Sequence, residues 1–114
     1  MTKYLISFPG PAMDHIPDGD WPAVSRDSHA VVQEAKDAGV WVFGGGINDV
    51  VDAVMVGGDG TVTNETYPQF KELTGGFTVI EVPSREEALT WATKFAVACR
   101  CSQEVREFGY DPES

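Results

Sequence analysis

A strand, a helix and a second strand follow one another twice along this chain, and that order constrains the fold more than any other feature. In the first half, "KYLISF" at residues 3–8 alternates its side chains between two faces, which is the period of a β-strand. Helical periodicity follows between Asp20 and Gly39. The apolar run "VWVFGGGI" at residues 40–47 then thins into glycines, which is typical of a central strand that another backbone or a ligand approaches closely.

The second half repeats this order with clearer boundaries. "FTVIEV" at residues 77–82 is rich in residues that favour strands. Ser84 precedes Glu87 by three residues, which is the capping box of a helix start. "SQEVREF" at residues 102–108 predicts the last strand. The helix between them has a predicted apolar face made of Ala88, Leu89, Ala92, Phe95, Ala96 and Cys99.

The first helix has recognisable ends and one apolar stripe. The Asp20 carboxylate is expected to cap the free amides of its first turn, in which Pro22 is tolerated. Gly39 supplies a left-handed stop. At about 100° per residue, His29 falls on the flank of the stripe. The stripe itself contains Val24, Ser28, Val31, Val32 and Ala35.

Three connecting segments have distinct turn chemistry. Four prolines and two glycines at residues 9–22 predict a surface loop without regular structure. In "AVMVGGDGTVT" at residues 53–63, the Gly-Gly-Asp-Gly sequence predicts a hairpin. "NETYPQFKEL" at residues 64–73 is compatible with a turn or two of helix.

Together these elements predict an α+β, ferredoxin-like βαββαβ fold with an extra hairpin, in which two helices pack on one face of an antiparallel sheet. With 114 residues and 42% hydrophobic content, one domain over residues 1–114 is expected. Neighbouring residues of a strand face opposite ways, so Trp41, Phe43 and the apolar residues at 77–82 cannot all face the helices. We therefore predict a homodimer that buries the second sheet face between two copies.

The negative charge of the chain makes some classes of binding partner unfavourable. A formal net charge of −10 repels phosphate backbones and anionic lipid, so neither nucleic acid nor a membrane is an expected partner. The chain has no run of about 18 apolar residues, and its start turns polar and proline-rich at once. We expect a cytoplasmic protein.

Several segments resemble the YCII-related family, and more closely its branch known as the DGPF-domain proteins. They are "GVWVFGGGI", "DGTVTNETYPQFKELTGGFTVIEV", "REEALTWA" and "EVREF", and the resemblance runs from the first strand to Phe108. It implies a ferredoxin-like fold assembled as a dimeric α+β barrel. The residues that name the branch correspond here to Asn64, Glu65, Thr66 and Tyr67, of which the aromatic Tyr67 alone is retained.

The same resemblance implies a site centred on a histidine and an aspartate. His29 matches the histidine of the family's helix. The aspartate that usually follows the first strand falls near Pro9 and Gly10, and Asp14 is the nearest substitute by chain position, although it does not match the motif. A few relatives act on small ring compounds in degradative pathways, and one of them is a dehydrochlorinase.

The candidate site residues each have a second interpretation. His29 is a candidate general acid or base, because imidazole transfers protons near neutral pH. Otherwise it is a solvated surface residue. Trp41 and Phe43 are candidates to bind substrate in an apolar pocket, or else they belong to the core with Trp21 and Trp91. Tyr67 is a further candidate for substrate binding.

No metal or cofactor is predicted. The loop "DHIPDGD" gathers Asp14, His15, Asp18 and Asp20, but its spacing misses the calcium-loop pattern, so a solvated acidic turn is expected. Cys99 and Cys101 provide two thiols without the second pair that a zinc site needs. Flavin, nicotinamide and haem signatures are not found in the sequence.

Two functions from different classes fit these features. The first is an acid/base enzyme that acts on a small, cyclic or carboxylated metabolite in a cavity of the dimer, with His29 and Asp14 as catalytic residues. The second is a non-catalytic binding or regulatory dimer that presents an acidic surface to a protein partner. In the second case His29 is replaceable, and charge reversal at Glu34 or Asp37 weakens the partner complex.

Overall fold

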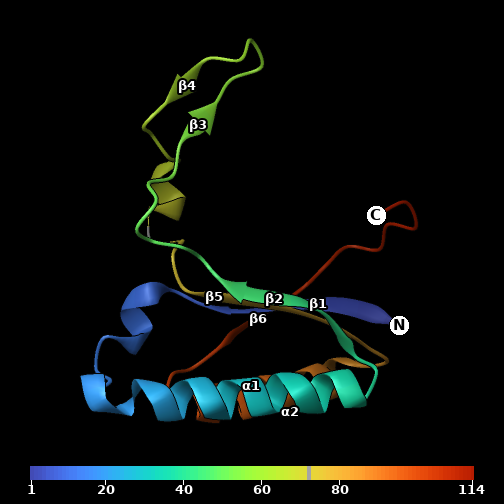
Figure 1. Ribbon diagram of the computed structural model, residues 1–114. Coiled ribbons are helices and arrows are strands. Elements are labelled where there is room, and N and C mark those ends of the chain that lie inside the picture. Colours follow the sequence, from blue (N-terminus) through green and yellow to red (C-terminus); the bar gives the residue numbers. More distant parts are fainter. Residues whose placement is uncertain (72) are drawn as a thin grey trace.

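The computed structural model describes residues 1–71 and 73–114, which form one antiparallel sheet, two long helices and a projecting hairpin (Figure 1). The helices are α1 (Trp21–Asp37) and α2 (Arg85–Cys99). The sheet contains β1 (Thr2–Phe8), β2 (Trp41–Gly46), β5 (Gly76–Val82) and β6 (Glu104–Glu107) in the order β2-β5-β1-β6. The hairpin contains β3 (Met55–Val56) and β4 (Val62–Thr63).

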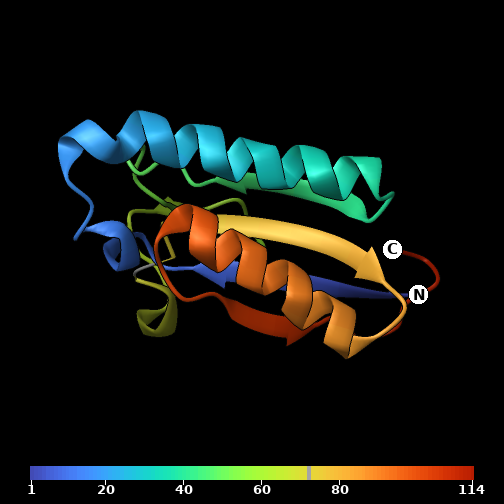
Figure 2. The ribbon, with the colours of Figure 1, turned by 90° about the horizontal axis from the view of Figure 1, so that it is seen from below.

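Both long helices pack on one face of the sheet, and the opposite face, on whose side the hairpin and the C-terminal tail rise, has no long helix over it among the described residues (Figures 1 and 2). All three strand pairings in the sheet are antiparallel. The order of the elements confirms the predicted α+β arrangement of βαββαβ type with an extra hairpin.

The core lies between the helices and the covered sheet face. Ile6, Ile80 and Val82 are the largest fully buried side chains, and each contributes about 1.5–3 kcal/mol of hydrophobic stabilisation. Trp41 and Trp91 are half-buried and pack against the same cluster, whereas Trp21, also predicted in the core, is 40% exposed. Trp21 is exposed because it is the first residue of α1, beyond the end of the apolar stripe.

α1 begins where predicted, but its cap differs. The backbone of Asp20 is already helical, with φ −92° and ψ −11°, because the 3-10 turn η2 (Asp18–Asp20) leads directly into α1. An aspartate caps a helix from an extended backbone, so the prediction of an Asp20 side-chain cap is wrong. The left-handed stop is confirmed, since Gly39 has φ +75°.

α2 confirms its predicted start and most of its apolar face. The Ser84 hydroxyl accepts a hydrogen bond from the Glu87 backbone N–H at 3.2 Å. Ala88, Ala92 and Phe95 are buried. Leu89 is 40% exposed, because one residue beyond Ala88 the helix has turned about 100° away from the core.

β2 is an edge strand, so the prediction of a central strand is wrong. A bulge separates Trp41, which pairs with Ile80, from Phe43, which pairs with Val79. The bulge reverses the alternation, so the two aromatic residues point to opposite faces of the sheet although they are two positions apart. Phe43 is left 65% exposed on the uncovered face.

The connecting segments contain short turns. The hairpin is confirmed, and Gly60 has φ +87° in its turn. The loop at residues 9–22 was predicted to lack regular structure, but prolines favour tight turns and it forms η1 (Gly10–Met13) and η2. The segment at 64–73 contains one 3-10 turn, η3 (Pro68–Phe70), and its residue Glu72 lies outside the described residues.

Gly75 is required by the close approach of β1. A Cβ atom at this position would lie 1.8 Å from the Phe8 carbonyl oxygen, whereas a Cβ at Gly58 would have no heavy atom within 4 Å. We expect Gly75→Ala to lower the free energy of unfolding by about 2–3 kcal/mol, because the backbone must move. Gly58→Ala is the matched control. Urea unfolding measures both, and equal midpoints for the two variants would contradict this packing.

Candidate functional site

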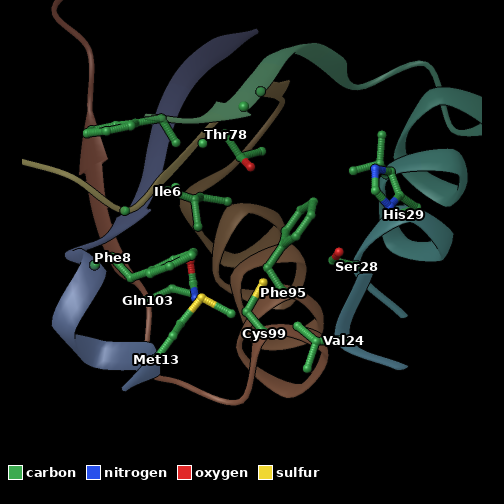
Figure 3. Close-up of a pocket in the computed structure, with 18 of the residues that line it drawn as sticks. Ile6, Phe8, Met13, Val24, Ser28, His29, Thr78, Phe95, Cys99 and Gln103 are labelled. Carbon is green, nitrogen blue, oxygen red and sulfur yellow. The ribbon is translucent and has the colours of Figure 1, made fainter. Parts of the chain in front are cut away.

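A cavity of about 770 Å³ lies between α1, the covered side of the sheet and η1 (Figure 3). Its size is that of a site for a small organic ligand. Ile6, Val24, Val32 and Phe95 form apolar walls. His29 and Asp14, the two predicted catalytic residues, both line this cavity.

His29 is held in one tautomer by its own helix. Its Nδ1 atom lies 2.7 Å from the Ser25 carbonyl oxygen and 3.3 Å from the Ser25 hydroxyl. A carbonyl oxygen can only accept, so Nδ1 carries the proton and donates. In the neutral ring, Nε2 is then the unprotonated nitrogen that can accept a proton. Figure 3 places the ring on the cavity side of α1, across from Thr78 and Phe95.

Asp14 also lines the cavity, from the end of η1. It follows η1, and its backbone N–H donates to the Pro11 carbonyl at 3.1 Å. Its side chain is exposed, and within residues 1–71 and 73–114 no hydrogen bond joins it to His29. The structure therefore brings the two predicted residues to one cavity without direct contact.

Trp41 and Phe43 also line the cavity, from opposite faces of β2. The Trp41 ring lies 6.4 Å from the Phe95 ring, centroid to centroid. Trp41 needs Gly44 beside it, because a Cβ at Gly44 would lie 2.4 Å from the edge of the indole. Trp41 therefore packs against the core and also lines the cavity, and its role in substrate binding stays a prediction.

Tyr67 lies elsewhere. It lines a separate cavity of about 630 Å³ below the hairpin, together with Asn64, Glu65 and Thr66. Within this chain, the structure does not bring Tyr67 to the cavity of His29.

The two cysteines are free thiols, and Cys99 lines the His29 cavity. Burial raises the pKa of the Cys99 thiol to about 11, and it also raises the pKa of Cys101. Cys99 is therefore mostly protonated at pH 8 and is not a ready nucleophile.

We expect iodoacetamide at pH 8 to modify Cys101 first and Cys99 only on unfolding, because Cys101 is the more exposed of the two. Peptide mass spectrometry over a time course measures both sites. Modification of Cys99 at the rate of Cys101 in the folded protein would contradict the burial of Cys99.

The polar residues of the cavity that the sequence interpretation missed include Lys36, Asp49 and Gln103. Lys36 had a usable signal, because it follows His29 by seven residues, or two helical turns, on the same side of α1. Gln103 had none, because it enters the cavity from the loop between α2 and β6, and its position depends on the tertiary fold.

Neither a metal cluster nor a membrane span is found in the part of the chain that the structure describes. No group of three or more His, Cys, Asp or Glu side chains there is arranged to hold a metal ion. The described helices include none with the length and apolar character needed to cross a bilayer.

Comparison with known proteins agrees with this architecture. Residues 22–107 match the YCII-related domain. The structure is similar to that of 5-chloro-2-hydroxyhydroquinone dehydrochlorinase from Burkholderia phenoliruptrix AC1100 in complex with 2,5-dihydroxybenzoquinone. The TM-score is 0.50, the sequence identity is 14%, and 97% of each chain is covered. This likeness concerns the fold. No curated protein matches the sequence. Because the match covers residues 22–107, which include nearly all of both long helices and three of the four strands of the sheet, the chain belongs to the family of YCII-related domain proteins.

Proposed function

We propose that this protein is an acid/base enzyme that moves a proton on a small cyclic metabolite, with His29 as the group that accepts and returns the proton. One observation carries the proposal. The Nδ1 atom of His29 lies 2.7 Å from the Ser25 carbonyl oxygen and donates its proton to it, so Nε2 is the basic nitrogen at a cavity of about 770 Å³. The His29 side chain is exposed at the rim of this cavity, and a fixed tautomer within reach of a bound compound is what a general base needs.

The proposed step begins with proton abstraction. Nε2 takes a proton from a substrate carbon next to a carbonyl group, and the C–H electron pair becomes the double bond of an enolate. The enolate then takes the proton back at another carbon, which is an isomerisation, or expels a leaving group with its electron pair, which is an elimination. Asp14 lines the same cavity, and its negative charge would stabilise the positively charged imidazolium that forms when Nε2 accepts the proton.

A ring compound suits the walls of the cavity. Trp41 and Phe95 provide flat apolar surfaces on the covered side of the sheet. The dehydrochlorinase of similar fold was solved with a hydroxylated quinone, which supports the choice of a ring substrate. Hydroxylated quinones, cyclic enones and lactones are therefore the first compounds to test.

A homodimer, as a dimeric α+β barrel, is part of the proposal. Leu5 and Val79 pair with each other on the uncovered sheet face, and Phe43 pairs with Val79 beside them. The hairpin rises on this same side of the sheet (Figure 1), and its exposed apolar residues include Val51, Val54, Val56 and Val62. Exposed apolar side chains that gather on one side of a protein in this way are typical of a protein–protein interface. In this proposal the segment that follows the hairpin and carries Tyr67 packs against the second copy. Tyr67 would then approach the substrate in the His29 cavity of that copy.

Three further parts of the proposal come from the sequence. The segments "DGTVTNETYPQF" and "REEALTWA" support the DGPF branch of the family. The single domain over residues 1–114 and the cytoplasmic location are likewise proposals.

The test is incorporation of deuterium from D₂O into the carbon positions of the panel compounds, followed by proton NMR. Exchange above the buffer rate for at least one compound is the expected result, because proton abstraction is detected even when the complete reaction is unknown. A panel that shows neither exchange nor binding would overturn the proposal and favour the non-catalytic dimer. That alternative has weak support, because Glu34 pairs with Lys94 and Asp37 accepts a hydrogen bond from Gln33.

A further inference from the structure

Lys36 is the only lysine or arginine that lines the His29 cavity within the part of the chain that the structure describes. It makes no ion pair and no side-chain hydrogen bond with any described residue. Four of the seven other lysine and arginine side chains form ion pairs between described residues, namely Lys3 with Glu81, Lys94 with Glu34, Arg100 with Asp27 and Arg106 with Glu104. Among the described residues, Lys36 shares the unpaired state with Arg26, Lys71 and Arg85, but none of those three lines the cavity. The cavity therefore has one exposed ammonium group that makes no ion pair with any carboxylate among residues 1–71 and 73–114.

Helix geometry relates Lys36 to His29. Seven residues at 100° each bring Lys36 to within about 20° of the direction of His29, and the two Cα atoms are about 10 Å apart along the axis. Val32 lies between them and lines the same cavity. A ring placed over Val32 would have a proton acceptor on one side and a positive charge on the other.

The acidic residues of the cavity lie toward its other end. Asp14 follows η1 and Asp49 follows β2, and both elements end toward the end of the molecule where α1 starts, whereas Lys36 is in the last turn of α1 (Figure 1). α1 has 17 residues and is therefore about 25 Å long. Asp14 and Asp49 repel an anionic group and Lys36 attracts it, so the charges orient a ligand along α1.

We propose that Lys36 forms an anion subsite that selects ring compounds with a carboxylate several ångströms from the reacting carbon. The proposal rests on the proposed function, since it names the class of compound that His29 would meet. The ammonium group donates charge-assisted hydrogen bonds to the carboxylate, and the ring then lies over Val32 with its reacting end toward Nε2 of His29.

The test uses 3-(4-hydroxyphenyl)propionate and its neutral amide as probes, with dissociation constants from NMR titration of the amide signals of residues 44–46. We expect the carboxylate to bind about tenfold more tightly than the amide, which is typical of one charge-assisted hydrogen bond. Lys36→Gln should abolish this preference. Arg26→Gln should retain it, because Arg26 lies on the same helix, does not line the cavity and gives the same change in net charge.

Two results would overturn the anion subsite: a carboxylate preference that survives in Lys36→Gln, or a wild-type protein that binds the amide as tightly as the carboxylate or binds neither probe. Failure of the proposed function has a different signature. If the Lys36-dependent preference is found but deuterium exchange is absent, the anion subsite is supported and the acid/base activity is contradicted. If exchange is found without the preference, the activity is supported and the anion subsite is contradicted.

Discussion

Replacement of His29 by alanine should lower the rate of enzyme-dependent deuterium exchange by about 10²–10⁴-fold, which is the usual contribution of a general base. The reason is geometric: His29 provides the basic Nε2 in the cavity, while its Nδ1–H is engaged by the Ser25 carbonyl at 2.7 Å. The rate is measured by proton NMR in D₂O with the panel compound that exchanges fastest.

His15→Ala is the matched control for this experiment. His15 is the second of the two histidines of the chain, it is exposed, and it does not line the cavity. We expect its exchange rate to equal that of the wild type. An equal loss in both variants, or a His29→Ala variant with wild-type exchange, would remove His29 from the mechanism.

The second large effect concerns the uncovered sheet face. Val79→Lys should raise the dissociation constant of the dimer at least about 100-fold, because it places an unpaired charge in the middle of the proposed interface. Val79 pairs with Leu5 on one side and with Phe43 on the other, so it lies in the middle of this face. Sedimentation equilibrium over a range of protein concentrations measures the change.

Val97→Lys provides the same chemical change on the helical side of the molecule. Val97 lies on α2 and is 71% exposed, so it should leave the dimer intact. Wild-type protein that sediments as a monomer at micromolar concentration would overturn the dimer. Dissociation by both variants alike would show that the interface does not lie on the sheet.

The secondary structure was predictable because its signals are local. The capping box of Ser84 and Glu87, the left-handed Gly39 and the turn around Gly60 act within a few residues of themselves. Asp20 was predicted less well, because η2 changed its backbone before α1 began. The number, type and order of the main elements were therefore predicted correctly, and only the details of their ends differed.

Features that depend on pairing between distant segments were not predictable. The apolar run of β2 has the composition of a central strand, but its edge position is decided by which strand pairs with β5. The bulge that separates Trp41 from Phe43 is likewise absent from any local pattern. In an edge strand the same apolar composition leaves Phe43 exposed, which fits a surface that a second copy covers.

In the candidate site, too, features set by local sequence were predictable and features set by the tertiary fold were not. His29 was identified from the sequence, and its hydrogen-bond partner lies one helical turn earlier, at a distance that helix geometry explains. Asp14 reaches the same cavity through the η1 turn, although its position in the chain matches no motif. Tyr67 was grouped with these residues by resemblance, and the structure places it beneath the hairpin because the segment at 64–73 leaves the sheet.

The most direct test of the central claim is a long-range proton–nitrogen NMR spectrum of the two histidines, recorded at a pH where both are neutral, without and with the panel compound that exchanges fastest. We predict that His29 shows a protonated Nδ1 and an unprotonated Nε2, and that the compound shifts its Nε2 signal while the His15 signals stay unchanged. His29 with a protonated Nε2, or with an Nε2 signal that the compound leaves unchanged, would contradict the assignment of His29 as the base.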